Sequence, residues 1–168
     1  MAETNIRNIY WDACCWISLI NEEADWGKRC EYLIEQAKEE KVRIWTSTIS
    51  YAEVYKKKID GKIAQISEEK DRNFEEYLGQ DFIVLIQVDQ QVGLEARRLL
   101  RGNQGLNKPN DAIHLASAIL NNLDEFHTFD NKDLLPLNGL IKRSDGENLL
   151  ICEPPVPSNQ QAHFYLSS

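Results

Sequence analysis

The apolar positions along the chain alternate between two patterns. Short runs dense in apolar and β-branched residues predict strands, whereas longer stretches with apolar residues every three or four positions predict helices. Strands are expected at residues 6–11, 42–46, 82–88, 125–129 and 149–152, and helices at 13–21, 26–40, 48–59, 67–78, 89–100 and 109–120. Strands that alternate with helices at this spacing predict an α/β fold, a parallel sheet with helices on both faces.

The helix expected at 109–120 has the most distinctive pattern. Nearly every residue from Ala112 onward is apolar or small, so this helix would be apolar most of the way round and largely buried. Pro109 suits a first helical turn, where its missing N–H would be unpaired anyway. Asp111 falls in that opening turn, at the edge of the core. Taken alone, Asp111 is explained by its interaction with the helix dipole.

Length, composition and cysteine spacing indicate one globular domain with a tail. The chain has 168 residues, 42% hydrophobic and 27% charged, which is enough for one substantial core. We expect the domain to span residues 1–152 and a Pro-rich tail to occupy 153–168. No apolar run is long enough to cross a bilayer and no signal-peptide pattern is present, so a cytoplasmic protein without a membrane partner is expected. The four cysteines form no CxxC pair, which favours buried free thiols over zinc ligands.

The net charge of −8 narrows the possible ligands. It argues against a protein that coats nucleic acid generally, because phosphate binding needs an excess of lysine and arginine. A polyanionic ligand would therefore have to meet local basic patches or bound cations.

Four acidic residues fall where a parallel sheet of this kind forms its sites, at the carboxyl ends of its strands. Asp12 ends the first strand, Glu53 lies on the helix after the second, and Asp111 and Asp130 flank the fourth. Each has an ordinary structural explanation: Asp12 as a helix cap, Glu53 in a capping box, Asp130 in an Asx turn. Four such coincidences at one edge are less probable than one shared site.

A cluster of this kind needs a cation. Two carboxylates about 5 Å apart repel by roughly 3 kcal/mol at an effective dielectric near 20. Ligation by oxygen alone favours Mg²⁺ or Mn²⁺, which bind substrate phosphates and retain waters. The chemistry that follows is metal-assisted phosphodiester hydrolysis.

Four segments resemble the PIN-domain ribonuclease family, and most closely its VapC-type toxins. They are Ile-Tyr-Trp-Asp12 with Trp16-Ile-Ser-Leu, Thr46-Ser-Thr-Ile-Ser-Tyr-Ala-Glu53-Val, Asn110-Asp111-Ala-Ile-His-Leu-Ala and Thr128-Phe-Asp130. The resemblance covers roughly residues 9–152, and the order of the segments is more specific than any one of them.

This resemblance implies a three-layer fold with a five-stranded, mostly parallel sheet of order 3-2-1-4-5. It also implies that Asp12, Glu53, Asp111 and Asp130 are the catalytic, metal-binding acids, with Thr128 as a supporting residue and Asp133 as a further acid. Whether Asp130 or Asp133 is the better ligand stays open. Family members commonly form homodimers and, as toxins, are held inactive by a small antitoxin protein. One departure is Ala13, which stands where a hydroxyl residue often follows the first acid; one hydrogen bond is then either missing or supplied by Ser18 or Ser47.

Basic residues lie near two of the acids along the chain. Lys56 and Lys57 follow Glu53, and Arg98, Arg101 and Lys108 precede Asp111. They are candidates for gripping RNA phosphates, although a solvated helix face or an antitoxin contact explains Lys56 and Lys57 equally well. We expect His114 to be hydrogen-bonded near the site rather than to act as a general base.

Three other functions fit parts of the pattern. The protein could be a PIN-domain nuclease that processes RNA outside any toxin system, or a non-catalytic PIN scaffold. A receiver-like domain would instead place a phosphoryl group on a strand-end aspartate, here Asp89. That interpretation requires a paired acid at the first strand and a lysine after the last, and the sequence supplies neither.

Overall fold

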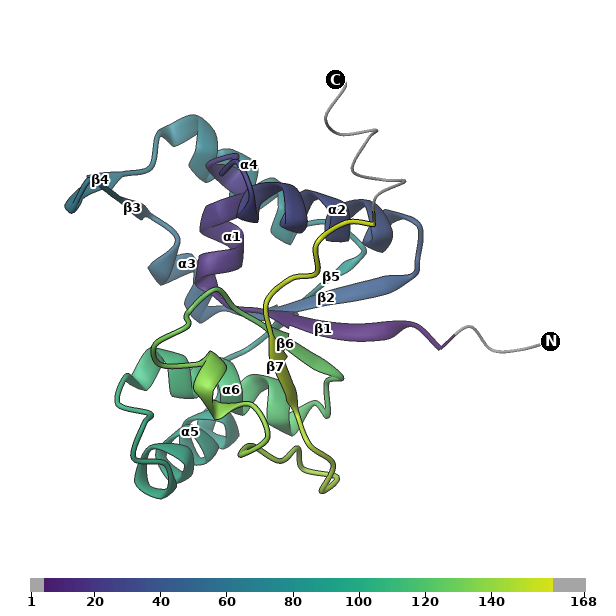
Figure 1. Ribbon diagram of the computed structural model, residues 1–168, viewed down its shortest axis with the longest axis vertical. Coiled ribbons are helices and arrows are strands. Elements are labelled where there is room, and N and C mark those ends of the chain that lie inside the picture. Colours follow the sequence, from purple (N-terminus) through teal and green to yellow (C-terminus); the bar gives the residue numbers. More distant parts are fainter. Residues whose placement is uncertain (1–4, 159–168) are drawn as a thin grey trace.

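The computed structural model describes residues 5–158, which form a central sheet covered by helices on both faces (Figure 1). The strands of this sheet are β1 (Arg7–Trp11), β2 (Val42–Ser47), β5 (Ile83–Ile86), β6 (Glu125–His127) and β7 (Leu150–Cys152). The helices are α1 (Ala13–Ile20), α2 (Trp26–Lys38), α3 (Ile49–Glu53), α4 (Glu68–Leu78), α5 (Gln90–Gly102) and α6 (Pro109–Leu120), with a 3₁₀ turn, η1 (Leu135–Leu137). No helix in this part of the chain is both long enough and apolar enough to span a membrane.

All neighbouring strands of the sheet run parallel, in the order β5-β2-β1-β6-β7. Numbered along the chain, its five strands have the order 3-2-1-4-5, as expected. The register aligns Tyr10 of β1 with Trp45 of β2 and Phe126 of β6. The carboxyl ends of the three central strands therefore meet at one edge, and the segments that follow them begin side by side.

Alternation along β1 divides the interior into two cores. Ile9 and Trp11 face α1, α2 and α4, whereas Tyr10 points to the opposite face and packs with α5 and α6. Figure 1 shows these two groups of helices on opposite sides of the sheet. Helix α6 contributes buried residues along most of its length, which confirms the expectation of a core helix.

The helix expected at 48–59 is wrong beyond Glu53. Helix α3 ends there, and the chain forms a separate antiparallel hairpin from β3 (Lys56–Ile59) and β4 (Lys62–Gln65). The turn consists of Asp60 and Gly61, both with positive φ (48° and 77°), as a two-residue hairpin turn requires. The three lysines at 56–58 give a continued helix no apolar face to bury.

The start of the expected tail follows β7 and lies against α2. Arg29 pairs with Glu153 at 2.9 Å and donates to the Pro154 carbonyl. The rest of the tail, residues 159–168, lies outside the described part of the chain. All four cysteines are free thiols; Cys15 and Cys30 are buried as predicted, whereas Cys14 and Cys152 are only half-buried.

Candidate active site

A cavity of about 410 Å³ opens where the carboxyl ends of β1, β2 and β6 meet. The strand order reverses direction at β1, so this edge is the switch point at which open α/β sheets bind ligands. All four acids predicted as catalytic contribute to its walls. Its lining residues are Asp12, Ala13, Cys14, Ile17, Ala52, Glu53, Tyr55, Lys56, Asn110, Asp111, His114 and Asp130.

Asp12 is the innermost of these acids and also caps α1. Its Oδ1 accepts hydrogen bonds from the backbone N–H groups of Cys14 (3.1 Å) and Cys15 (3.3 Å), and from the Cys14 thiol (2.8 Å). All three bonds end on Oδ1, so the cap leaves Oδ2 for another role. Burial raises the pKa of Asp12, while nearby His114 and the hydrogen bonds oppose the rise.

The Cys14 thiol provides a side-chain hydrogen bond to Asp12, although Ala13 cannot. The thiol donates to Asp12 and accepts from the backbone N–H of Phe129 at 3.1 Å, which ties α1 to the segment after β6. The expectation that Ser18 would serve is wrong, because Ser18 donates to Glu23 instead. Ser47 is buried at the end of β2 and does not line the cavity.

Asp111 lies in the first turn of α6, as predicted, and its carboxylate has the fewest hydrogen-bond partners among the four acids. Its Oδ2 is buried and has no hydrogen-bond partner among the described residues. Burial raises the pKa of Asp111 to about 6; the Asp12 and Asp130 carboxylates add to the rise, and Lys108 opposes it. An orphaned carboxylate oxygen beside other acids is the arrangement that a bound cation relieves.

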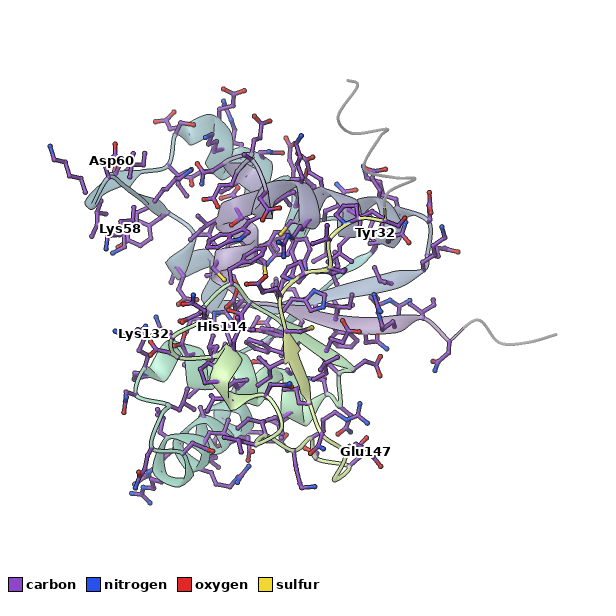
Figure 2. All side chains as sticks on the ribbon, viewed as in Figure 1. Tyr32, Lys58, Asp60, His114, Lys132 and Glu147 are labelled. Carbon is purple, nitrogen blue, oxygen red and sulfur yellow. The ribbon has the colours of Figure 1, made fainter. Side chains whose placement is uncertain are left out.

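Glu53 is held by two residues of α6. Its Oε1 accepts from Asn110 Nδ2 at 3.1 Å, and its Oε2 lies 2.5 Å from His114 Nε2. The other ring nitrogen of His114 lies 2.7 Å from the Tyr10 hydroxyl. Because a carboxylate can only accept, Nε2 of His114 carries a proton and donates to Glu53; when the ring holds that proton alone, Nδ1 accepts from the Tyr10 hydroxyl. His114 is buried and hydrogen-bonded at both ring nitrogens, as the sequence led us to expect. Figure 2 labels it near the middle of the molecule.

Asp130 sits in the loop after β6, between Thr128 and Asp133. Its Oδ1 accepts from the backbone N–H groups of Lys132 (3.0 Å) and Asp133 (2.8 Å), an Asx turn, and the Thr128 hydroxyl accepts from the Asp130 N–H at 3.0 Å. Asp133 does not line the cavity. It pairs with Lys108 at 2.5 Å, and Lys108 also lies 4.0 Å from Asp130 Oδ2.

The donor set fits a hard divalent cation. Asp111, Asp130 and Asp133 each offer a carboxylate oxygen, and these atoms lie within 4.8 Å of one another. Asp12 and Glu53 face the same cavity. Carboxylate oxygens are the ligands that Mg²⁺ and Mn²⁺ prefer, and the unpartnered Asp111 Oδ2 gives an independent reason for a cation there.

The basic residues predicted to bind RNA differ in their distance from the cavity. Lys56 lines the cavity, with its ammonium 4.8 Å from the centre of the Tyr55 ring. Lys57 pairs with Glu23, and Arg98 pairs with Glu95 on its own helix. Arg101 is exposed on α5, away from the cavity lining.

Two contributors to the site were not predicted from the sequence. Asn110 was named only as part of the segment around Asp111, and Cys14 was grouped with the free thiols. Both stand within two residues of a predicted acid, and that closeness in sequence was the one available signal.

The receiver-like alternative does not fit this arrangement. Asp89 lies outside the cavity, where its side chain accepts from the Val92 N–H and caps α5. A receiver sheet of order 2-1-3-4-5 also differs from the order found here.

Comparison with known proteins agrees with the geometry. The model of the family described as PIN domain matches residues 9–135. Among solved structures, the Mycobacterium tuberculosis toxin VapC20, described as cleaving the sarcin–ricin loop, superposes with a TM-score of 0.56 at 14% identity, covering 73% of this chain and 90% of its own. VapBC2 from Rickettsia felis, bound to a promoter DNA fragment, gives a TM-score of 0.57 at 15% identity, covering 86% and 96%.

A toxin–antitoxin complex from Klebsiella pneumoniae gives a TM-score of 0.56 at 20% identity and covers 89% of this chain and 99% of its own. At these identities the structures share the fold. A search of curated protein sequences gives no significant match. The family match spans most of the chain and includes all four cavity acids, so this chain belongs to the PIN-domain family.

Proposed function

We propose that this protein is an endoribonuclease that depends on Mg²⁺ or Mn²⁺ and hydrolyses RNA phosphodiester bonds. The observation that carries the proposal is the single cavity into which Asp12, Glu53, Asp111 and Asp130 converge from four separate segments. A non-catalytic scaffold would not need to hold an unpartnered carboxylate oxygen beside two other acids. That feature costs stability and suits the binding of a cation.

The acids have two different parts in the proposed site. Asp12, Asp111 and Asp130, with Asp133 beside them, would hold the cation. The bound cation would lower the pKa of a water molecule, and its positive charge would stabilise the phosphate. Glu53, which the sequence also predicted as a cation ligand, is fixed by Asn110 and His114 and would orient the attacking water and accept its proton. Lys56 at the cavity wall would contact a substrate phosphate.

A cleavage assay tests this proposal. Purified wild-type protein should cleave structured RNA with Mg²⁺ or Mn²⁺ and not in EDTA. Replacing residues that only support metal ligands typically costs about 10- to 100-fold. Asp111→Asn removes a proposed cation ligand, so it should lower the cleavage rate by about 100-fold or more. Asp81→Asn, which changes an exposed acid outside the cavity, is the matched control and should keep the wild-type rate. If Asp111→Asn cleaves as fast as wild type, the nuclease assignment is wrong.

We also propose that the protein is the toxin of a toxin–antitoxin pair, acts in the cytoplasm as a homodimer, and is inhibited by a small antitoxin. The support is the shared fold with structures described as toxins and toxin–antitoxin complexes. Expression of the wild-type protein alone should stop growth. Asp12→Asn, which keeps the α1 cap, should not stop it. Growth unaffected by an active nuclease would point to RNA processing instead.

A further inference from the structure

The β3–β4 hairpin stands away from the body of the protein. Its strands bond to each other, and its base is closed by the bond from the Ile66 N–H to the Tyr55 carbonyl. Ile59 and Ile63 are 50% and 68% exposed. Figure 1 shows the hairpin projecting beyond α3 and α4, and Figure 2 shows Lys58 and Asp60 at its outer part. This element adds little to either core, so its sequence is free to serve another role.

The charge of the hairpin is opposite to that of the whole chain. It carries Lys56, Lys57, Lys58 and Lys62 against one acid, Asp60, in a protein of net charge −8. Only Lys57 forms an ion pair, with Glu23 at 3.5 Å; none involves Lys58 or Lys62 within residues 5–158. Unpaired lysines concentrated on a protruding element favour a polyanionic ligand.

The strand pairing places these lysines on two different faces. Lys56 lies opposite Gln65 and Lys58 opposite Ile63, whereas Lys57 lies opposite Ala64 and Lys62 opposite Ile59. Side chains alternate along a strand, so Lys56 and Lys58 share one face, about 7 Å apart, while Lys57 and Lys62 share the other. Lys56 lines the acidic cavity. Its face therefore forms a basic track that begins at the cavity and leads outward to Lys58.

We infer that the Lys56–Lys58 face of the hairpin binds the phosphate backbone of single-stranded RNA where the strand leaves the cavity. Tyr55, 45% exposed and also in the cavity wall, offers an aromatic face on which a base can stack at the start of this track. The inference rests on the proposed function, because it takes RNA as the ligand of the cavity. It adds a binding surface that reads backbone charge and not base sequence.

The expected magnitude follows from counterion release. One phosphate contact on a single strand contributes roughly 0.7 to the slope of log K against log salt, which is about five-fold in affinity between 1 M and 0.1 M salt. The full-length wild-type chain and its Lys58→Gln variant are titrated into a short fluorescein-labelled single-stranded RNA in EDTA, and anisotropy is followed across a salt series. Lys58→Gln should bind about five-fold more weakly near 0.1 M salt, with the slope reduced by about 0.7.

Lys62→Gln is the matched control, because it removes the same charge from the opposite face of the same hairpin. It should bind within two-fold of wild type, as should Lys28→Gln on α2. Lys58 and Lys62 are both exposed, and thermal melting of each variant checks that the fold is intact. Equal losses for Lys58→Gln and Lys62→Gln, or no loss for either, would overturn the inference.

This test does not depend on cleavage. If Asp111→Asn fails to reduce cleavage but Lys58→Gln still weakens RNA binding, the nuclease assignment fails and the binding face stands. If cleavage depends on Asp111 but Lys58→Gln binds like wild type, the proposed function stands and the hairpin is not an RNA-binding surface. An acidic protein that binds wild type and not Lys58→Gln, while RNA binding is unchanged, would reassign this face to a protein partner.

Discussion

At the scale of single residues, Asp111 links the chemistry of the site to the stability of the fold. Its pKa of about 6 lies above the ordinary aspartate value of 3.8, and burial is the main cause. A carboxyl whose folded pKa is raised binds its proton more tightly in the native state. Protonation of Asp111 therefore adds most to the free energy of unfolding below about pH 4, and this contribution is lost as the pH rises through about 6.

The prediction is that metal-free Asp111→Asn is more stable than metal-free wild type, and that the difference grows with pH. Urea unfolding in EDTA near pH 5 and near pH 8 measures both free energies. The advantage of the variant should be larger near pH 8, where the wild-type carboxylate is charged and unpartnered. A stability difference that stays constant or shrinks from pH 5 to pH 8 would show that ionised Asp111 is not destabilised by its surroundings.

We expect Tyr10 to act on the site through His114. Its hydroxyl is buried with the imidazole, and His114 in turn fixes Glu53. Tyr10→Phe removes one hydroxyl without changing the packing against Phe126, whose ring stacks on Tyr10 at 5.2 Å. The variant should lose about 1–2 kcal/mol of stability, because it leaves a buried ring nitrogen unpaired.

If Glu53 needs this support, the cleavage rate of Tyr10→Phe should also fall, by about ten-fold at saturating RNA. Single-turnover rates and chemical unfolding measure the two effects separately. A loss of stability with an unchanged rate would assign the Tyr10 hydroxyl to the fold alone.

The candidate acids could be predicted from sequence because each occupies a fixed place relative to a strand end or a helix start. The ordinary structural roles that competed with this interpretation are real in two cases: Asp12 caps α1, and Asp130 forms an Asx turn. In both, the structural bonds use Oδ1 alone, so one side chain serves both purposes. The partners Asn110 and Cys14 were missed because their contacts depend on how α6 and α1 sit on the sheet, which the local pattern does not encode.

At the scale of elements, α1 begins on a residue of the site. Asp12 accepts from two backbone N–H groups in the first turn, so replacing it affects both the helix and the proposed cation site. Asparagine can also cap a helix, whereas alanine cannot. Asp12→Ala should therefore be about 1 kcal/mol less stable than Asp12→Asn, while both should lose cleavage.

Thermal melting compared with cleavage rates tests this separation. Equal stability of the two variants would mean that the cap contributes nothing to α1. Cleavage retained by Asp12→Asn would mean that hydrogen-bonding capacity, and not charge, is what the site requires at this position.

The elements themselves were largely predictable, and the failures have local causes. Buried strands and α6 carry strong patterns because they contact the core along most of their length. The segment after Tyr55 has no such contact, and the predicted helix was extended through it from an apolar spacing that ends at Val54 and Tyr55. The Asp60-Gly61 pair is a strong hairpin signal, and it outweighs helix continuation once no apolar face remains to be buried.

At the scale of the whole molecule, the sheet order brings distant acids together. Helices α1 and α6 lie on opposite sides of the sheet, and their N-terminal ends meet at the edge where β1 and β6 terminate. The alternation of strands and helices predicts a layered parallel sheet, but many strand orders satisfy it. The order 3-2-1-4-5 was available only through the resemblance to a family, because no local pattern specifies which strands are neighbours.

Because negative charge converges at one edge, we expect the stability of the molecule to depend on divalent cations. A ligand that binds only the folded state stabilises it by about 2.7 kcal/mol at 100 times its dissociation constant. For a protein of this size, that corresponds to a rise in Tm of roughly 5 to 10 °C. Mg²⁺ or Mn²⁺ should produce such a rise in wild type, measured against KCl of equal ionic strength.

Asp130→Asn is the informative comparison, because asparagine can retain the Asx turn while removing one carboxylate from the cluster of Asp111, Asp130 and Asp133. Its Tm in EDTA should equal or exceed that of wild type, and its rise with the cation should be much smaller. The exposed Asp81→Asn should behave as wild type does in both conditions. If the cation raises the Tm of Asp130→Asn as much as that of wild type, the divalent ions bind elsewhere, and the acids of the cavity repel one another without compensation.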